Sequence, residues 1–247
     1  MKAFLTAVMF LTRIPVPRIQ SSKQDWQKSA IYFPIVGLII GAILSLASFG
    51  IERIFSEAVS AFLIVLLWIW VTGGLHIDGW MDLADGFGSN RSREETLEIM
   101  KDSRVGAMGV IAGICLIVGK MIAVYELLHL HLPSILVLSP FYARFLLISA
   151  IRLLPYRKEG GIGAGLRTYI TWLILAIHTL ILVGITYLTT GMSGILLFSV
   201  TAIITGLFVM KIYKKLNMLT GDCYGALVEF SECVSLFLAL AIWRFVA

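Results

Sequence analysis

Residues 61–88 read AFLIVLLWIWVTGGLHIDGWMDLADGFG, so a membrane-length apolar run leads directly into a segment with three aspartates and a histidine. Across the 247 residues of the chain, 59% are hydrophobic and only 14% are charged, whereas an ordinary soluble domain has about 25% charged residues. This composition predicts an integral membrane protein. Carboxylates placed against the end of a span are costly there and indicate a functional site.

The apolar stretches predict the number of spans. A helix that crosses a bilayer needs about 20 mostly apolar residues, and about seven stretches qualify. They are residues 29–51, 57–75, 106–128, 134–152, 169–188, 194–212 and 232–247. MKAFLTAVMFLTRIPVPR, at the start of the chain, lacks a small-residue cleavage site, so we expect an N-terminal interfacial or re-entrant helix there. The sequence therefore predicts an all-α, polytopic helical bundle, one integral-membrane domain over residues 1–247.

The basic residues predict the orientation of the bundle, because short cytoplasmic loops collect Lys and Arg. With the N-terminus inside, sixteen of the 20 basic residues lie on the inner side, and only Arg53 and Arg244 lie outside. The longer loops 76–105, 153–168 and 213–231 are then cytoplasmic. The net charge of +5 reports this topology and gives no indication of nucleic-acid binding.

Asp78, Asp82 and Asp85 lie at positions i, i+4 and i+7, so a helix continuing from the second span would carry all three on one face. No Lys or Arg occurs between Arg53 and Arg91, which disfavours the alternative of a merely solvated helix end. Hard oxygen ligands of this kind suit Mg²⁺ or Mn²⁺ better than zinc. The spacing therefore predicts a face that binds a divalent cation.

A second acidic group follows in GDCYGALVE, where Asp222 and Glu229 are seven residues apart and Glu232 comes three later. One helical face can present them all, on the same inner side as the aspartates. The two acidic faces together would suit a metal pair or a Mg²⁺-bound diphosphate. The alternative is simply an acidic entry to the last helix. His76 is open between a catalytic base and a hydrogen-bonded residue lining the site, because no second His or Cys stands at ligand spacing.

KDSRVGAMG, residues 101–109, leads charged residues into a small-residue helix start. Backbone N–H groups at such a start, with Lys101, Ser103 and Arg104 beside them, suit a phosphate. Arg144 lies inside a predicted span, where a cation is usually functional. Arg157 begins the loop RKEGGIGAGLR, which is either a flap over an anionic substrate or an ordinary positive-inside loop. Metal ligands together with phosphate-binding groups indicate phosphoryl transfer.

RIPVP, FPIVGLIIG, GGLHIDGWMDLADGF, KDSRVGAMGV and TGDCYGALVE occur in this order over nearly the whole chain. Together they resemble cobalamin synthase, the adenosylcobinamide-GDP ribazoletransferase family. The resemblance implies a multi-pass, Mg²⁺-dependent enzyme of the cell inner membrane, with its N-terminus and active site cytoplasmic. In this reaction α-ribazole or its 5′-phosphate attacks the cobinamide-linked phosphate of adenosylcobinamide-GDP, giving adenosylcobalamin or its 5′-phosphate and releasing GMP. The expected partners are these small molecules and the lipid bilayer, with no nucleic acid and with homo-oligomerisation left open.

The resemblance also suggests roles for the residues singled out above. Asp78, Asp82 and Asp85 would hold Mg²⁺ on the diphosphate, and Arg104 would neutralise charge on the leaving GMP. Asp222 or Glu229 would complete the metal site or orient the attacking hydroxyl. The candidate catalytic residues are Asp82, Arg104, Glu229 and His76, the candidate metal ligands are Asp78, Asp82, Asp85 and Asp222, and the candidate substrate-binding residues are Lys101, Ser103, Arg144 and Arg157.

Two other classes of protein share some of these features. A CDP-alcohol phosphotransferase has a motif that opens like Asp82-Leu83-Ala84-Asp85-Gly86, but no Ala-Arg follows here at the required distance. A cation-coupled transporter also carries intramembrane carboxylates, but it is expected to place them near mid-span and to show repeat symmetry. The clustering of these carboxylates at one membrane face disfavours transport.

Overall fold

The protein is described by a computed structural model, which covers residues 1–17, 19–156, 161 and 163–246. Within these residues the chain is helical and contains no strand, which confirms the all-α prediction. The helices are α1 (Lys2–Leu11), α2 (Lys23–Ser29), η1 (Ala30–Tyr32), α3 (Phe33–Ile51), α4 (Glu57–Thr72), α5 (Leu75–Gly88), α6 (Arg93–Ile99), α7 (Ala107–His129), α8 (Ser134–Leu153), η2 (Leu166–Tyr169), α9 (Trp172–Leu216) and α10 (Gly221–Val246).

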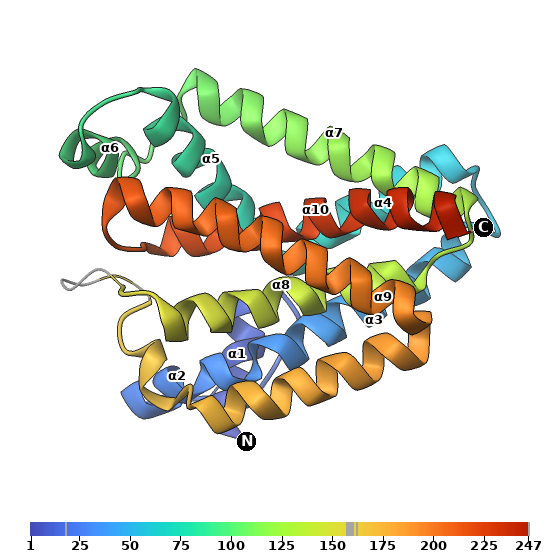
Figure 1. Cartoon of the computed structure of the whole chain (residues 1–247), viewed down its shortest axis with the longest axis horizontal. Coiled ribbons are helices and arrows are strands. Elements are labelled where there is room, and N and C mark those ends of the chain that lie inside the picture. Colours follow the sequence, from blue (N-terminus) through green and yellow to red (C-terminus); the bar gives the residue numbers. More distant parts are fainter. Residues whose placement is uncertain (18, 157–160, 162, 247) are drawn as a thin grey trace.

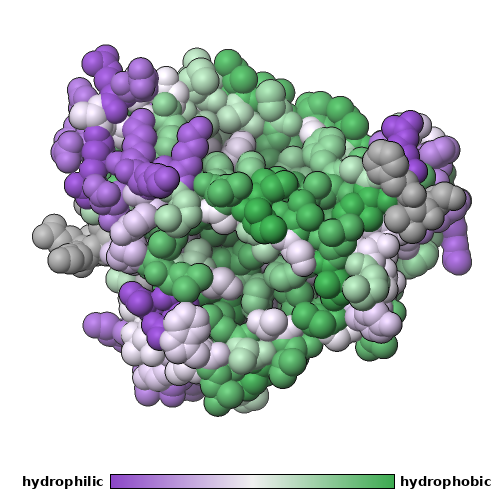
Figure 2. All heavy atoms as spheres, viewed as in Figure 1, coloured by the Kyte–Doolittle hydropathy of each residue, from purple (hydrophilic) through white to green (hydrophobic). Residues whose placement is uncertain are grey.

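The long helices form a membrane bundle. Among the described residues, five helical segments are long and apolar enough to cross a bilayer, and the bent pair α4–α5 makes a sixth if it counts as one span. Figure 1 shows these helices side by side, and Figure 2 shows a hydrophobic band between hydrophilic side chains at both ends of the molecule. The prediction of a polytopic membrane protein is therefore confirmed. The short apolar helix α1, with 10 residues, is too short to span.

The second predicted span does not continue as one helix into the aspartate segment. Gly73 and Gly74 adopt φ of 66° and 70°, a left-handed conformation that glycine tolerates at little cost, and α5 leaves α4 at an angle of 91°. The backbone N–H of Arg13 donates to the Val71 carbonyl at 2.7 Å, which ties the N-terminal segment to the end of α4. The three aspartates consequently lie on a helix of their own.

Helix α9 accounts for two of the predicted spans. It has 45 residues, but Gly191 interrupts it with φ 62° and ψ −149°, a backbone region that is almost restricted to glycine. In Figure 1 the chain reverses direction along this helix, and the two halves run back past one another. The side chain of Tyr142 contacts both halves, through the Thr186 hydroxyl at 3.0 Å and the Gly194 carbonyl at 3.4 Å.

The last helix begins earlier than the hydropathy pattern predicts. We expected a span over 232–247 after an inner loop over 213–231, but α10 starts at Gly221 and includes the whole second acidic group. Glu229 and Glu232 are therefore inside the bundle, where hydropathy alone would not place carboxylates. The partners that compensate their charges are described below.

Small residues allow helices to approach closely, and Gly37 and Gly41 of α3 are two such residues. A Cβ atom at Gly37 would lie 2.5 Å from the Pro140 carbonyl oxygen, and one at Gly41 would lie 2.5 Å from that of Val137. Helix α3 is thus packed backbone to backbone against α8. Both helices also contribute to the cavity described next, α3 through Phe33 and α8 through Leu147 and Ile151.

Candidate active site

Helices α5 and α10 cross at a contact between glycines. A Cβ atom at Gly79 would lie 2.8 Å from the Cα atom of Asp222, and one at Gly225 would lie 3.1 Å from the His76 carbonyl oxygen. A larger residue at Gly79 would require the Asp222 backbone to move, whereas at Gly225 the contact is tight but less severe. Because Asp78 precedes Gly79 and Asp222 is the residue that Gly79 meets, the crossing brings together two carboxylates that are far apart in the chain.

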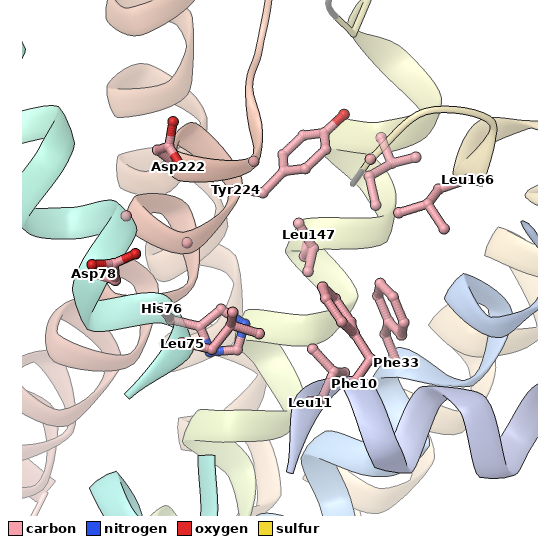
Figure 3. Close-up of a pocket in the computed structure, with 15 residues that line it drawn as sticks. Phe10, Leu11, Phe33, Leu75, His76, Asp78, Leu147, Leu166, Asp222 and Tyr224 are labelled. Carbon is pink, nitrogen blue, oxygen red and sulfur yellow. The ribbon is translucent and has the colours of Figure 1, made fainter. Parts of the chain in front are cut away.

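A cavity of about 140 Å³ opens beside this crossing. Figure 3 shows Asp78 and Asp222 at one end of it and apolar side chains from α1, α3, α8 and η2 at the other. Its apolar lining includes Phe10, Leu11, Phe33, Leu147, Ile151 and Leu166. His76 and Tyr224 also line the cavity. The predicted site residues His76, Asp78 and Asp222, which come from both acidic segments, therefore line one cavity.

The Asp82 carboxylate lies close enough to Asp78, Asp222 and Asp85 to be repelled by the charges of all three. Among the described residues no salt bridge involves any of these four aspartates. Oxygen donors of one sign without a cationic side chain fit a hard divalent cation in chemical type. Within the same residues, however, no group of three or more His, Cys, Asp or Glu side chains is already arranged to hold a metal ion.

Asp85 caps the start of α7. Its two oxygens accept hydrogen bonds from the backbone N–H of Gly106 at 2.7 Å and of Gly109 at 2.8 Å. A Cβ atom at either glycine would collide with this carboxylate. The helix start that we expected to bind a phosphate therefore already holds an anionic group, supplied by the chain itself.

The three predicted phosphate-binding side chains before α7, Lys101, Ser103 and Arg104, differ in their surroundings. The Arg104 side chain is 87% exposed and pairs with Asp102 at 2.6 Å, and its hydrogen bonds lower the pKa of Asp102 to about 2. Ser103 is exposed. Lys101 lines a second cavity of about 200 Å³, whose walls also include Thr220 and Asp222. Asp222 therefore borders both cavities.

Arg157, predicted to bind substrate, lies outside the described residues.

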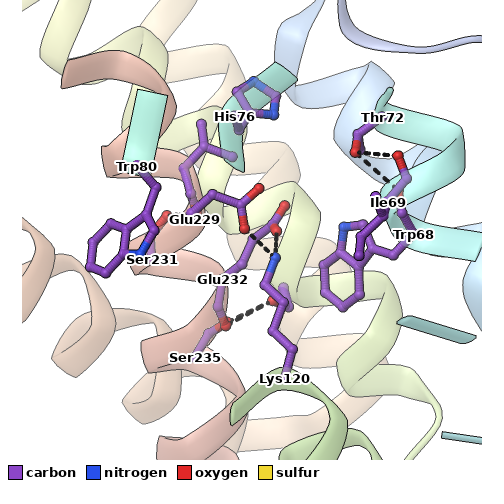
Figure 4. A network of polar contacts seen from close by, with 12 residues as sticks. Trp68, Ile69, Thr72, His76, Trp80, Lys120, Glu229, Ser231, Glu232 and Ser235 are labelled. Carbon is purple, nitrogen blue, oxygen red and sulfur yellow. Dashed lines mark hydrogen bonds and ion pairs between the residues drawn. The ribbon is translucent and has the colours of Figure 1, made fainter. Parts of the chain in front are cut away.

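Deeper in the bundle, a buried ionic network connects α7, α8 and α10, and Figure 4 shows its members Lys120, Glu229 and Glu232. The Lys120 ammonium donates to Glu229 at 2.5 Å and to Glu232 at 2.6 Å, and Arg144 pairs with the other oxygen of Glu232. All four side chains are at most 5% exposed. Two cations and two carboxylates make the network neutral, which is what lets these charges remain inside an apolar bundle.

The network reaches the cavity through His76. Arg144 Nη2 lies 3.5 Å from His76 Nδ1, and a guanidinium can only donate. His76 Nδ1 is therefore the acceptor, and in the neutral ring the proton is carried by Nε2. Arg144 is itself fully buried, so its contact with the cavity is made through His76.

Lys120 is the main participant that the sequence reasoning missed. Lys120 lies within the predicted span 106–128. A cation inside an apolar span usually has a function, which is the criterion that identified Arg144 and could also have identified Lys120. The ring of Trp68 lies 4.5 Å from the Lys120 ammonium, a cation–π contact that further stabilises the buried charge.

Comparison with known proteins gives a consistent result. The family described as Cobalamin-5-phosphate synthase matches residues 3–240. A relative from Brevibacillus brevis, named adenosylcobinamide-GDP ribazoletransferase, is 42% identical and the match covers 98% of this chain and 99% of the relative. Relatives of the same name from Desulfitobacterium hafniense and Clostridium acetobutylicum are 35% and 33% identical, with at least 95% of each chain covered. No solved structure matches this chain.

Proposed function

The chain belongs to the cobalamin-5-phosphate synthase family, and from this premise we propose that it is an adenosylcobinamide-GDP ribazoletransferase. The family resemblance inferred from the motifs is confirmed by the matches. In the proposed reaction a hydroxyl oxygen of α-ribazole, or of its 5′-phosphate, bonds to the phosphorus attached to cobinamide. The bond from that phosphorus to the bridging oxygen of the diphosphate breaks, GMP leaves, and the hydroxyl proton is released.

The observation that supports this reaction best is the meeting of Asp78 and Asp222 at one cavity, with Asp82 beside them. These carboxylates would repel a diphosphate unless a cation lay between them. We therefore propose that Asp78, Asp82 and Asp222 hold Mg²⁺ and that Asp85 contributes through lone pairs not used by the α7 amides. When bound, Mg²⁺ would neutralise charge on the diphosphate and on the departing GMP.

Four side chains have different proposed roles in the reaction. Asp222 would orient the attacking hydroxyl beside the leaving group, and the support for this role is that Asp222 borders both cavities. Lys101, on the wall of the second cavity, would bind a phosphate of the nucleotide. His76 would donate from Nε2 into the first cavity. Glu229 would not contact the substrate directly, because its buried carboxylate is engaged by Lys120.

Arg104 requires a change of partner. It is tied to Asp102 at 2.6 Å and would have to exchange that carboxylate for a phosphate of the substrate in order to neutralise the leaving group. The exchange is between two anions at an exposed position, so its net cost is small. The predicted role of Ser103 is to donate to the same phosphate.

We further propose that the site faces the cytoplasm from the inner membrane. The support is the excess of basic residues on the side that carries α6 and the two cavities.

Release of GMP tests the proposal directly. Purified protein in detergent is given adenosylcobinamide-GDP, with and without α-ribazole and with and without Mg²⁺. We expect GMP only when all three are present. Asp82→Asn should lower the rate by about 100-fold or more, as loss of a group that stabilises transition-state charge does. Glu98→Gln, at an exposed carboxylate of α6, serves as the matched control and should retain activity.

Two results would contradict the proposal at different points. Full Mg²⁺-dependent activity in Asp82→Asn would show that the metal assignment is wrong. No GMP release by the wild-type protein under any of these conditions would exclude the reaction itself.

A further inference from the structure

The cavity beside the α5–α10 crossing has two chemically different ends. Asp78 and Asp222 form one end, and Figure 3 shows Phe10, Phe33 and Leu147 gathered at the opposite end. The metal ligands and reacting phosphate proposed above use only the acidic end. The apolar end is left without a role by the proposed chemistry.

The aromatic wall of the apolar end is held in place by its neighbours. Phe10 lies 6.0 Å from Phe33 with the ring planes 27° apart, and it contacts Trp26 edge-on at 4.8 Å. On the far side, Tyr224 stacks on Tyr156 at 5.5 Å. Rings fixed by such contacts offer preformed faces to a flat ligand with little loss of side-chain freedom on binding.

Size and polarity select among the parts of the two substrates. A cavity of about 140 Å³ cannot enclose a corrin macrocycle. A guanine ring has several N–H and C=O groups, which would lose their hydrogen bonds among Phe10, Leu147 and Leu166 at a substantial cost. The base of α-ribazole is a flat, methylated benzimidazole without N–H groups, so it is the part of the substrates that matches the apolar end.

We propose that this apolar end binds the flat benzimidazole-type base of the acceptor nucleoside, with the ribose directed toward Asp78 and Asp222. The inference rests on the proposed function and assigns a substrate to a named part of its site. It also gives α1 a part in the enzyme, because Phe10 and Leu11 form a wall of the pocket. The second cavity, lined by Lys101 and Thr220, is left for the leaving nucleotide.

Direct binding of α-ribazole, without the second substrate, tests the assignment. Leu75 lines the cavity and is 36% exposed, so Leu75→Trp can fill part of the pocket without overpacking a closed core. We expect Leu75→Trp to weaken α-ribazole binding about tenfold by calorimetry. Leu66→Trp is the matched control, because Leu66 is 50% exposed on α4 and lines none of the cavities described. It should bind as the wild type does.

A change in the preference of the enzyme for one nucleoside base over another cannot be caused by misfolding, because misfolding lowers the activity with both nucleosides. Phe10→Ala removes a ring from the apolar end, so a nucleoside with a bulkier, naphthimidazole base should be used better relative to α-ribazole. We expect the ratio of kcat/KM values, bulky over natural, to rise at least about fivefold. Phe49→Ala, which removes a 55% exposed ring of α3, should leave this ratio unchanged.

The outcomes separate the subsite from the reaction. If the wild type releases GMP but Leu75→Trp binds α-ribazole normally and Phe10→Ala keeps the wild-type base preference, the base binds elsewhere and the inference is wrong. If the wild type binds α-ribazole at this pocket but releases no GMP, the subsite stands and the proposed reaction fails.

Discussion

The buried position of Lys120 allows a quantitative test of the ionic network. Lys120→Met keeps an unbranched side chain of similar length but removes the ammonium that contacts Glu229 at 2.5 Å and Glu232 at 2.6 Å. Glu232 retains Arg144, whereas Glu229 loses its only ion-pair partner among the described residues. Breaking a buried pair in this way costs about 3–5 kcal/mol. At about 2–4 °C per kcal/mol for a chain of this size, the midpoint of unfolding should fall by about 6–20 °C.

Restoring the charge balance should recover much of this loss. In Lys120→Met/Glu229→Gln the cation and one carboxylate are both gone, so the remaining Glu232–Arg144 pair is neutral as a unit. We expect the double variant to melt above Lys120→Met, because replacing a whole buried pair costs less than leaving one charge without a partner. Thermal unfolding of the purified protein in one detergent, followed by the loss of monodisperse protein, measures both variants.

Lys211→Met is the matched control, since Lys211 is exposed on α9 and substitutions at such positions change stability by less than about 0.5 kcal/mol. If Lys120→Met melts together with Lys211→Met, the buried ammonium does not stabilise the fold. If the double variant melts below Lys120→Met, compensation of buried charge is not what holds these helices together.

Two further predictions concern the site itself. Gly79→Ala should destabilise the protein by about 1–3 kcal/mol and lower GMP release, because the added Cβ would meet the Asp222 backbone at 2.8 Å. Gly206→Ala is the control, because the space around Gly206 is open. In the same unfolding and activity assays it should be neutral or slightly stabilising. In a carbon-13 NMR titration, Asp102 should protonate near pH 2, and Arg104→Gln should return its pKa toward 3.8. Because the folded-state pKa is the lower one, the stability that this pair adds is present above pH 3.8 and is lost as the pH falls toward 2; an unchanged Asp102 titration in Arg104→Gln would contradict the assignment.

Much of the architecture could be predicted from local patterns in the chain. Apolar stretches of span length predicted the membrane helices, and the i, i+4, i+7 spacing predicted the shared face of Asp78, Asp82 and Asp85 on α5. These features depend on hydropathy and periodicity, both of which can be read within one segment.

Other features of the site depend on contacts between distant segments of the chain. The backbone amides at the start of α7 were predicted to bind a phosphate, but the Asp85 carboxylate accepts hydrogen bonds from two of them, those of Gly106 and Gly109. Glu229 was expected on an acidic helical face at the cytoplasmic side, but it is buried in the bundle, where Lys120 compensates its charge. The cost of a buried charge depends on which group faces it, and that partner comes from a distant part of the chain.

The sequence by itself therefore determined the class of protein, its helices and the acidic residues of the site. Tertiary structure decided which carboxylates share a cavity and which are held by cations in the bundle. The physical reason is that glycine contacts such as that of Gly79 with Asp222 set the crossing of α5 and α10. The crossing fixes where each carboxylate points, and no periodicity within either helix contains that information.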